Sequence, residues 1–259
     1  MNKSPAINIL ESVLRKVGKF LKRDFFELEH LQSSAQANNI FVNKAFERTR
    51  QMLCEEFIKL KPDYSIAVSD AYDAYEGSAN LCFIIEPIDG MVNFARAQPE
   101  FALTAAIKVK ISGVICAACI YMPILEVVYF AEKGQASWYE GNIERFSKAS
   151  RSRVSQRKSN IFAVIEHINI PQIQDIADNF KIINCYAYSA AMVACGKLDF
   201  AALSKGSVAS RAVAALLVQE AGGFIITNQQ KDHIINDDTV IIYSNANLLN
   251  RFEKIFQPR

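Results

Sequence analysis

The pair of carboxylates at Glu86 and Asp89 is the feature of this sequence most suited to chemistry. Residues 81–85 before the pair, Leu-Cys-Phe-Ile-Ile, are typical of a buried strand. Pro87 removes a backbone donor and Gly90 permits a tight turn, so the strand must end at this corner. Mg²⁺ takes one or two protein carboxylates and completes its shell with water or phosphate. The spacing therefore suits a divalent cation, and an ordinary turn with solvated acids is the alternative interpretation.

The same stretch carries a resemblance to a known family. Residues 86–94, Glu-Pro-Ile-Asp-Gly-Met-Val-Asn-Phe, are similar to the Asp-Pro-Ile-Asp-Gly-Thr-x-Asn-Phe signature of the inositol monophosphatase family. Residues 195–200 and 212–223, which end in Glu-Ala-Gly-Gly, resemble its other landmark. The resemblance extends over most of the chain and is to the bacterial extragenic-suppressor branch, SuhB, in particular. It implies an α/β layered fold, an αβαβα sandwich with an antiparallel sheet in the N-terminal half and a mixed sheet in the C-terminal half.

The resemblance also implies an activity and a set of site residues. Family members are Mg²⁺-dependent phosphomonoesterases, in which clustered acids hold ions that bind the phosphate and activate a water. The residues implied for one residual, weak Mg²⁺ site are Glu86, the carbonyl of Ile88 and Asp89, with Asp70 close by in the sequence. The residues implied for phosphate binding at a helix start are Gly90, Met91 and Asn93.

Several positions depart from the family pattern. Met91 replaces the threonine that helps to position the nucleophilic water, and Ser69 falls on a metal-binding glutamate. Ser210 stands where an aspartate would ligate a second ion, and Leu203 falls near an acid that binds a substrate hydroxyl. Tyr186 enters the segment that lines the sugar pocket. Met91 and Ser69 thus mark degenerate catalytic positions, and we expect no intact catalytic residue.

Two functions from different classes follow. The first is a weak or inactive phosphatase, a pseudoenzyme, that works through protein or RNA contacts, because the suppressor branch is associated with transcription and ribosomal RNA antitermination. Residues 145–158, with six basic residues and no acid, are the one stretch that hints at such a partner. A solvated connection is its other interpretation. The second function is an active Mg²⁺-dependent phosphomonoesterase for inositol monophosphate or a similar small phosphate ester. A third possible function is that of a purely structural subunit. The family resemblance implies a homodimer.

Length and composition limit the remaining classes. The 259 residues are 51% hydrophobic, enough for a sizeable core, and the net charge of +2 gives no global attraction to nucleic acid or membrane. No apolar run reaches the roughly 18 residues of a membrane span, and the N-terminus lacks a secretory pattern, so we expect a cytoplasmic protein. The six cysteines lie mostly in apolar runs and are expected to be reduced and buried.

Local patterns predict the elements. Ser4 and Pro5 favour a helix start, and a second helix follows the polar residues 32–39 and ends before Pro62. An antiparallel meander is predicted over residues 101–110, 114–121 and 125–131. In the second half, strands are predicted at 161–165, 181–185, 198–203, 224–227 and 240–243 between helical segments. We expect two halves, 1–145 and 146–259.

Overall fold

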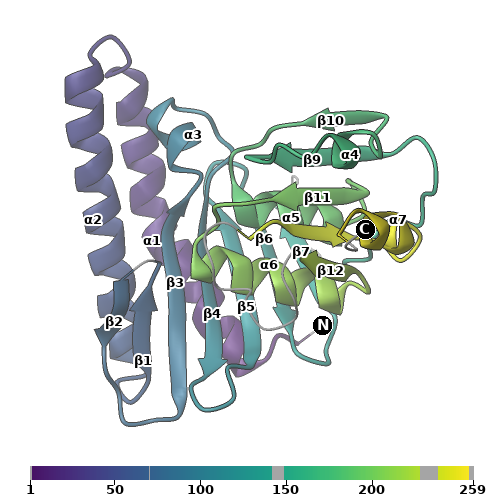
Figure 1. Ribbon diagram of the computed structural model, residues 1–259. Helices are drawn as coiled ribbons and strands as arrows, with labels where there is room; N and C mark the ends of the chain where they lie inside the picture. Colours follow the sequence, from purple (N-terminus) through teal and green to yellow (C-terminus); the bar gives the residue numbers. More distant parts are fainter. Residues whose placement is uncertain (1, 70, 142–148, 228–238, 257–259) are drawn as a thin grey trace.

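The computed structural model describes residues 2–69, 71–141, 149–227 and 239–256 (Figure 1). The first half contains α1 (Pro5–Glu29), α2 (Ala35–Leu60), β1 (Ser65–Val68), β2 (Ala71–Tyr75), β3 (Leu81–Asp89), α3 (Met91–Ala95), β4 (Ala102–Val109), β5 (Ile115–Met122), β6 (Val127–Glu132) and β7 (Ser137–Gly141). The second contains β8 (Ser150–Arg151), β9 (Phe162–Glu166), α4 (Pro171–Gln174), β10 (Asn179–Lys181), α5 (Tyr186–Ala194), β11 (Phe200–Leu203), α6 (Val208–Glu220), β12 (Phe224–Thr227), β13 (Ile241–Ser244) and α7 (Leu249–Phe256).

The first sheet has eight strands in the order β2-β1-β3-β4-β5-β6-β7-β8. The predicted antiparallel meander is present, because β3 to β8 pair antiparallel with their neighbours. One pair differs, since β1 lies parallel to β3 and so makes this sheet mixed. The reason is that β2 intervenes in the chain between these strands and occupies the outer edge, beside β1.

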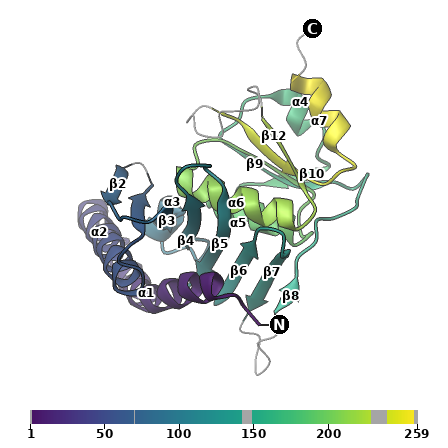
Figure 2. The same cartoon turned by 90° about the horizontal axis from the view of Figure 1, so that it is seen from below.

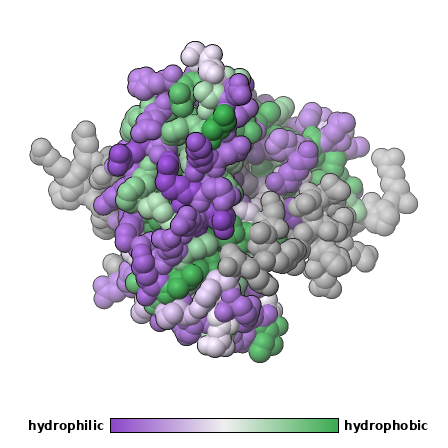
Figure 3. All heavy atoms as spheres, turned by 90° about the vertical axis from the view of Figure 1, so that its left-hand side faces the viewer, coloured by the Kyte–Doolittle hydropathy of each residue, from purple (hydrophilic) through white to green (hydrophobic). Residues whose placement is uncertain are grey.

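The two helices predicted for the first half are present as α1 and α2, and they cover one face of this sheet (Figure 2). Ser4 caps α1 by accepting a hydrogen bond from the Ile7 amide, and Pro5 is its first residue. The second helix starts earlier than expected, at Ala35 after the Ser34 cap, so residues 35–39 are helical in spite of their polarity. Only Asn38 among these residues is buried. The other polar side chains remain in contact with solvent, so their polarity is compatible with a helix. The face of the molecule that carries α2 is largely hydrophilic (Figure 3).

The second sheet has five strands in the order β10-β9-β11-β13-β12 and mixes parallel with antiparallel pairs. The strand predicted at 181–185 is wrong in its position along the chain, because the residues that pair with β9 are Asn179–Lys181. Residues 183–185 instead lead into α5, and the amides of residues 183, 184, 186 and 187 donate hydrogen bonds to side chains rather than to a neighbouring strand. The other four predicted strands of this half overlap β9, β11, β12 and β13.

Helices α5 and α6 form the middle layer between the two sheets (Figure 2). Their apolar side chains pack with residues of both sheets in one core, while α4 and α7 cover the outer face of the second sheet. The order of layers is therefore αβαβα. Glu220, at the end of α6, accepts hydrogen bonds from the amides of Gly134 and Ala136 in the β6–β7 turn. None of the described helices is long and apolar enough to cross a membrane.

Candidate functional site

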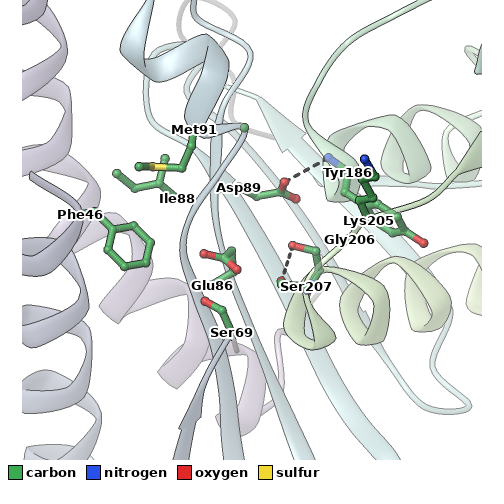
Figure 4. A pocket seen from close by; sticks show the side chains of 12 residues that line it. Phe46, Ser69, Glu86, Ile88, Asp89, Met91, Tyr186, Lys205, Gly206 and Ser207 are labelled. Atoms are coloured by element: carbon green, nitrogen blue, oxygen red, sulfur yellow. Dashed lines mark hydrogen bonds between the residues drawn. The ribbon is translucent and has the colours of Figure 1, made fainter. Parts of the chain in front are cut away.

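A cavity of about 560 Å³ opens where β3 ends, between α2 on one side and the first turns of α5 and α6 on the other (Figure 4). It contains the two acids and most of the site residues that the sequence predicts. The described residues that line it are Phe46, Ser69, Glu86, Ile88, Asp89, Gly90, Met91, Tyr186, Lys205, Gly206, Ser207 and Ser210.

The backbone at the end of β3 forms the predicted corner. The pairing register with β4 shifts between Glu86 and Asp89, which is consistent with the missing donor of Pro87. Gly90 then adopts a left-handed conformation with φ of 89°, and a Cβ atom there would lie 2.9 Å from the carbonyl oxygen of Glu100. Glycine is therefore required at the start of α3.

Asp89 is buried and its carboxylate serves as a helix cap. Its two oxygens accept hydrogen bonds from the amides of Tyr186, at 3.1 Å, and Ala187, at 2.7 Å. These are the first amides of α5, whose N-cap residue Cys185 supplies no side-chain acceptor. Burial raises the pKa of Asp89, although the two amides oppose this rise. Asp89 thus joins the first sheet to the middle layer.

Asn93 makes a second link between the same regions. Its amide nitrogen donates hydrogen bonds to the carbonyl oxygens of Glu100, at 2.7 Å, and Ile183, at 2.6 Å. The side chain is buried and faces backbone carbonyls, whereas Gly90 and Met91 line the cavity. The predicted role of Asn93 in phosphate binding stays a prediction.

Glu86 lies on the floor of the cavity, only 7% exposed. Burial, with a smaller contribution from the Asp89 charge, raises its pKa to about 7. The hydroxyl groups of Ser207 and Ser69 and the Ile88 amide oppose this rise. Glu86 therefore changes its charge near neutral pH.

Serine hydroxyls surround this floor. Ser207 caps α6 by accepting a hydrogen bond from the Ser210 amide at 3.1 Å, and its hydroxyl donates to that of Ser210 at 3.0 Å. Ser69 adopts a strained positive φ of 25°, and its hydroxyl lies close enough to Glu86 to oppose the rise in the pKa of that carboxyl. Asp70, which is close to these acids in the sequence, is outside the described residues.

Tyr186 forms one wall of the cavity. Its expected place in a segment that lines a sugar pocket stays a prediction. Its phenol oxygen lies 3.1 Å from that of Tyr243. The ring packs flat on Gly206, where a Cβ atom would approach ring carbons to 2.5 Å. The contacts with Tyr243 and Gly206 therefore fix the position of the Tyr186 ring.

Four lining residues were not singled out by the sequence, namely Phe46, Lys205, Gly206 and Ser207. Phe46 reaches the site only because α2 packs on the first sheet. The sequence did contain a signal for Ser207, because a serine directly before an apolar helical segment indicates a helix N-cap. Among the described residues, no group of three or more His, Cys, Asp or Glu side chains is placed to hold a metal.

Comparison with known proteins agrees with this fold. The model of the inositol monophosphatase family matches residues 2–257, and the chain therefore belongs to that family. An inositol-1-monophosphatase of Mesorhizobium japonicum is 25% identical over 256 residues, covering 93% of this chain and 92% of that protein. The Nus factor SuhB of Escherichia coli is 25% identical over 229 residues, covering 85% of this chain and 84% of that protein.

Solved structures show the same architecture. The extragenic suppressor protein SuhB of Bartonella henselae superposes with a TM-score of 0.82 at 23% identity, covering 98% of this chain and all of that one. The inositol monophosphatase of Thermotoga maritima superposes with a TM-score of 0.74 at 20% identity, covering 96% of this chain and 95% of that one.

The raised pKa of Glu86 predicts a pH-dependent stability. A carboxyl whose pKa rises from 4.5 unfolded to about 7 folded costs nothing below pH 4.5, and its cost grows as pH rises toward and past 7. A shift of that size corresponds to roughly 3 kcal/mol above pH 7. Glu86→Gln should therefore stabilise the protein at pH 8 and have much less effect at pH 5, as measured by urea unfolding.

The matched control is Glu27→Gln on the exposed face of α1, which removes one charge without burial. An equal effect of Glu86→Gln at both pH values would contradict the predicted cost of ionising Glu86.

Proposed function

We propose that this chain keeps the family fold but has weak or no Mg²⁺-dependent phosphatase activity, and that it works through contacts with protein or RNA. The observation that best supports this proposal is the use of Asp89 as the cap of α5. In this proposal the chain acts in the cytoplasm as a homodimer.

The donor groups of the cavity do not fit a centre of two ions. Its acids among the described residues are Glu86 and Asp89, and both oxygens of Asp89 already accept backbone hydrogen bonds. Ser69 and Ser210 contribute neutral hydroxyls where the resemblance implies carboxylates. Two-metal hydrolases need both ions to stabilise the attacking and leaving oxygens. The donor groups present therefore do not support a mechanism that uses two metal ions.

The partner in this proposal is the transcription machinery, since several relatives carry the name Nus factor SuhB. The described part of the basic stretch, 149–158, offers a surface for it. Arg151, Arg153 and Arg157 are exposed, while Ser152 and Val154 between them are buried. The Val154 amide donates to the Ala221 carbonyl, which fixes the backbone. Residues 145–148 lie outside the described residues.

A second candidate function is an altered phosphomonoesterase with one Mg²⁺. Glu86, Asp89 and the Ile88 carbonyl would hold the ion. Two carboxylates are enough, because Mg²⁺ is usually bound through one or two of them. The preserved corner at Gly90 favours this candidate, because the start of α3 still faces the cavity.

Phosphate release separates the two candidates. With inositol 1-phosphate or an aryl phosphate across millimolar Mg²⁺, we expect release no greater than that of Asp89→Asn. The reason is that few carboxylates are free to hold ions, and misplacing such groups by about 1 Å costs roughly 100-fold in rate. Circular dichroism should confirm that the variant is folded. Release that rises with Mg²⁺ and disappears in Asp89→Asn would contradict the leading proposal.

The basic surface makes a prediction of its own. Changing Arg151, Arg153 and Arg157 together to Glu should weaken capture of transcription-complex proteins or RNA by about tenfold or more, because attractive charges become repulsive. The measurement is a quantitative pull-down with the tagged full-length chain.

A matched control reverses three exposed basic residues on the two long helices, Lys19, Arg23 and Lys44. Binding that falls equally in both triple variants, or in neither, would remove residues 151–157 as the contact surface.

A further inference from the structure

A second cavity, of about 390 Å³, lies where the start of α1 meets strands β6 and β7 of the first sheet (Figure 2). It shares no lining residue with the cavity at the end of β3. Its apolar part is formed by Ile7, Phe130 and Trp138. Phe130 is buried and Trp138 is partly exposed, so the indole ring offers a surface on which a planar group can stack.

Ion pairs and a hydrogen bond hold the two sides of this cavity in place. On one side, the Lys3 ammonium group lies 2.6 Å from the carboxylate of Glu11 in α1 and 2.7 Å from that of Glu140 in β7. On the other side, the indole N–H of Trp138 donates to the carbonyl oxygen of Gln135 at 3.2 Å. The cavity is therefore formed in the free protein, which lowers the cost of binding.

The pairing of β7 with β8 places an arginine beside this cavity. Trp138 is the register partner of Phe130 on one side and of Arg151 on the other. Register partners project from the same face of a sheet, so Arg151 lies beside Trp138. The chain continues along β7 after β8, which keeps Arg153 at the same edge, and both arginines are exposed. Aromatic and basic side chains therefore meet at the mouth of the cavity.

The polar lining suits the edge of a nucleobase. Asn2 and Gln135 carry amides that both donate and accept, and Glu132 accepts. The carboxylate also disfavours a phosphate inside the cavity, whereas the arginines outside it suit one. Stacking on an aromatic ring and basic groups along the backbone are the two means by which proteins bind unpaired nucleotides.

We propose that this cavity binds an unpaired nucleotide, with its base stacked on Trp138 and its phosphate at Arg151 and Arg153. The nucleotide is either part of a single-stranded RNA or a free mononucleotide. This inference rests on the proposed function, because the two arginines belong to the basic surface that contacts a partner there.

The experiment uses the fluorescence of Trp138, which is the only tryptophan of the chain and so reports on the cavity directly. The full-length chain is titrated with single-stranded oligoadenylate in the presence of EDTA. The matched control is an abasic strand of the same length, which keeps the phosphates and lacks the bases. We expect oligoadenylate to quench the emission and the abasic strand to leave it unchanged. Equal effects of the two strands, or no effect of either, would overturn the inference.

Variants separate the contribution of the base from that of the phosphate. Trp138→Ala should weaken the binding of labelled oligoadenylate, measured by fluorescence anisotropy, about tenfold, as expected for the loss of one stacked base. Arg151→Ala keeps the reporter and changes an exposed side chain, and it should weaken binding and leave the quenching at saturation intact. Lys44→Ala, on the exposed face of α2, is the control and should change neither. Equal affinity of the Arg151 and Lys44 variants would contradict the proposal.

Two further results assign the source of the nucleotide. Tighter binding of oligoadenylate than of adenosine 5′-monophosphate assigns the site to RNA, and the reverse order assigns it to a free nucleotide. Turnover with Mg²⁺ would contradict the proposed function. An inactive chain that captures proteins through its basic surface, while no strand or mononucleotide changes its tryptophan emission, would contradict this inference alone.

Discussion

The hydrogen bonds from the first amides of α5 to Asp89 join the two halves of the chain. Asp89 ends a strand of the first sheet, and α5 belongs to the layer between the sheets. Hydrogen bonds to a charged acceptor contribute about 1.5–3 kcal/mol each, and a negative charge at a helix start is favourable. The residue most suited to metal chemistry in the sequence is thus a structural link in the fold.

Other side chains fix the connection that leads into α5, residues 183–185. Glu166 of β9 accepts hydrogen bonds from the amides of Ile183, at 2.6 Å, and Asn184, at 2.9 Å. Asn93 of α3 donates to the Ile183 carbonyl. Carboxylates from both sheets therefore hold one short segment, and this segment places the Tyr186 wall of the cavity. These contacts therefore help to set the shape of the cavity.

The sequence could predict the features that depend on neighbouring residues. The Ser4 cap, the helix end before Pro62 and the corner at Gly90 follow from local stereochemistry. The strand predicted at 181–185 was wrong because most of these residues form the connection into α5. Hydrogen bonds to distant side chains such as Glu166 hold this connection in place, and no local sequence pattern indicates such bonds.

The cavity was predictable only in part. The resemblance gave the acids, Ser69, Ser210 and Tyr186, because they belong to motifs. Phe46 lies far from those motifs in the chain and reaches the cavity through packing of the layers. Lys205 lies between the motif blocks 195–200 and 212–223, in a stretch that neither block covers. The cap formed by Asp89 joins residues 97 and 98 positions apart, so it depends on the completed fold.

The most direct test of this account is a crystal structure obtained in millimolar Mn²⁺, with anomalous scattering used to locate the ion. The account predicts that Asp89 still accepts the amides of Tyr186 and Ala187 and that no pair of ions lies between Glu86 and Asp89. Two anomalous peaks in the cavity, with Asp89 turned from α5 to ligate them, would contradict it.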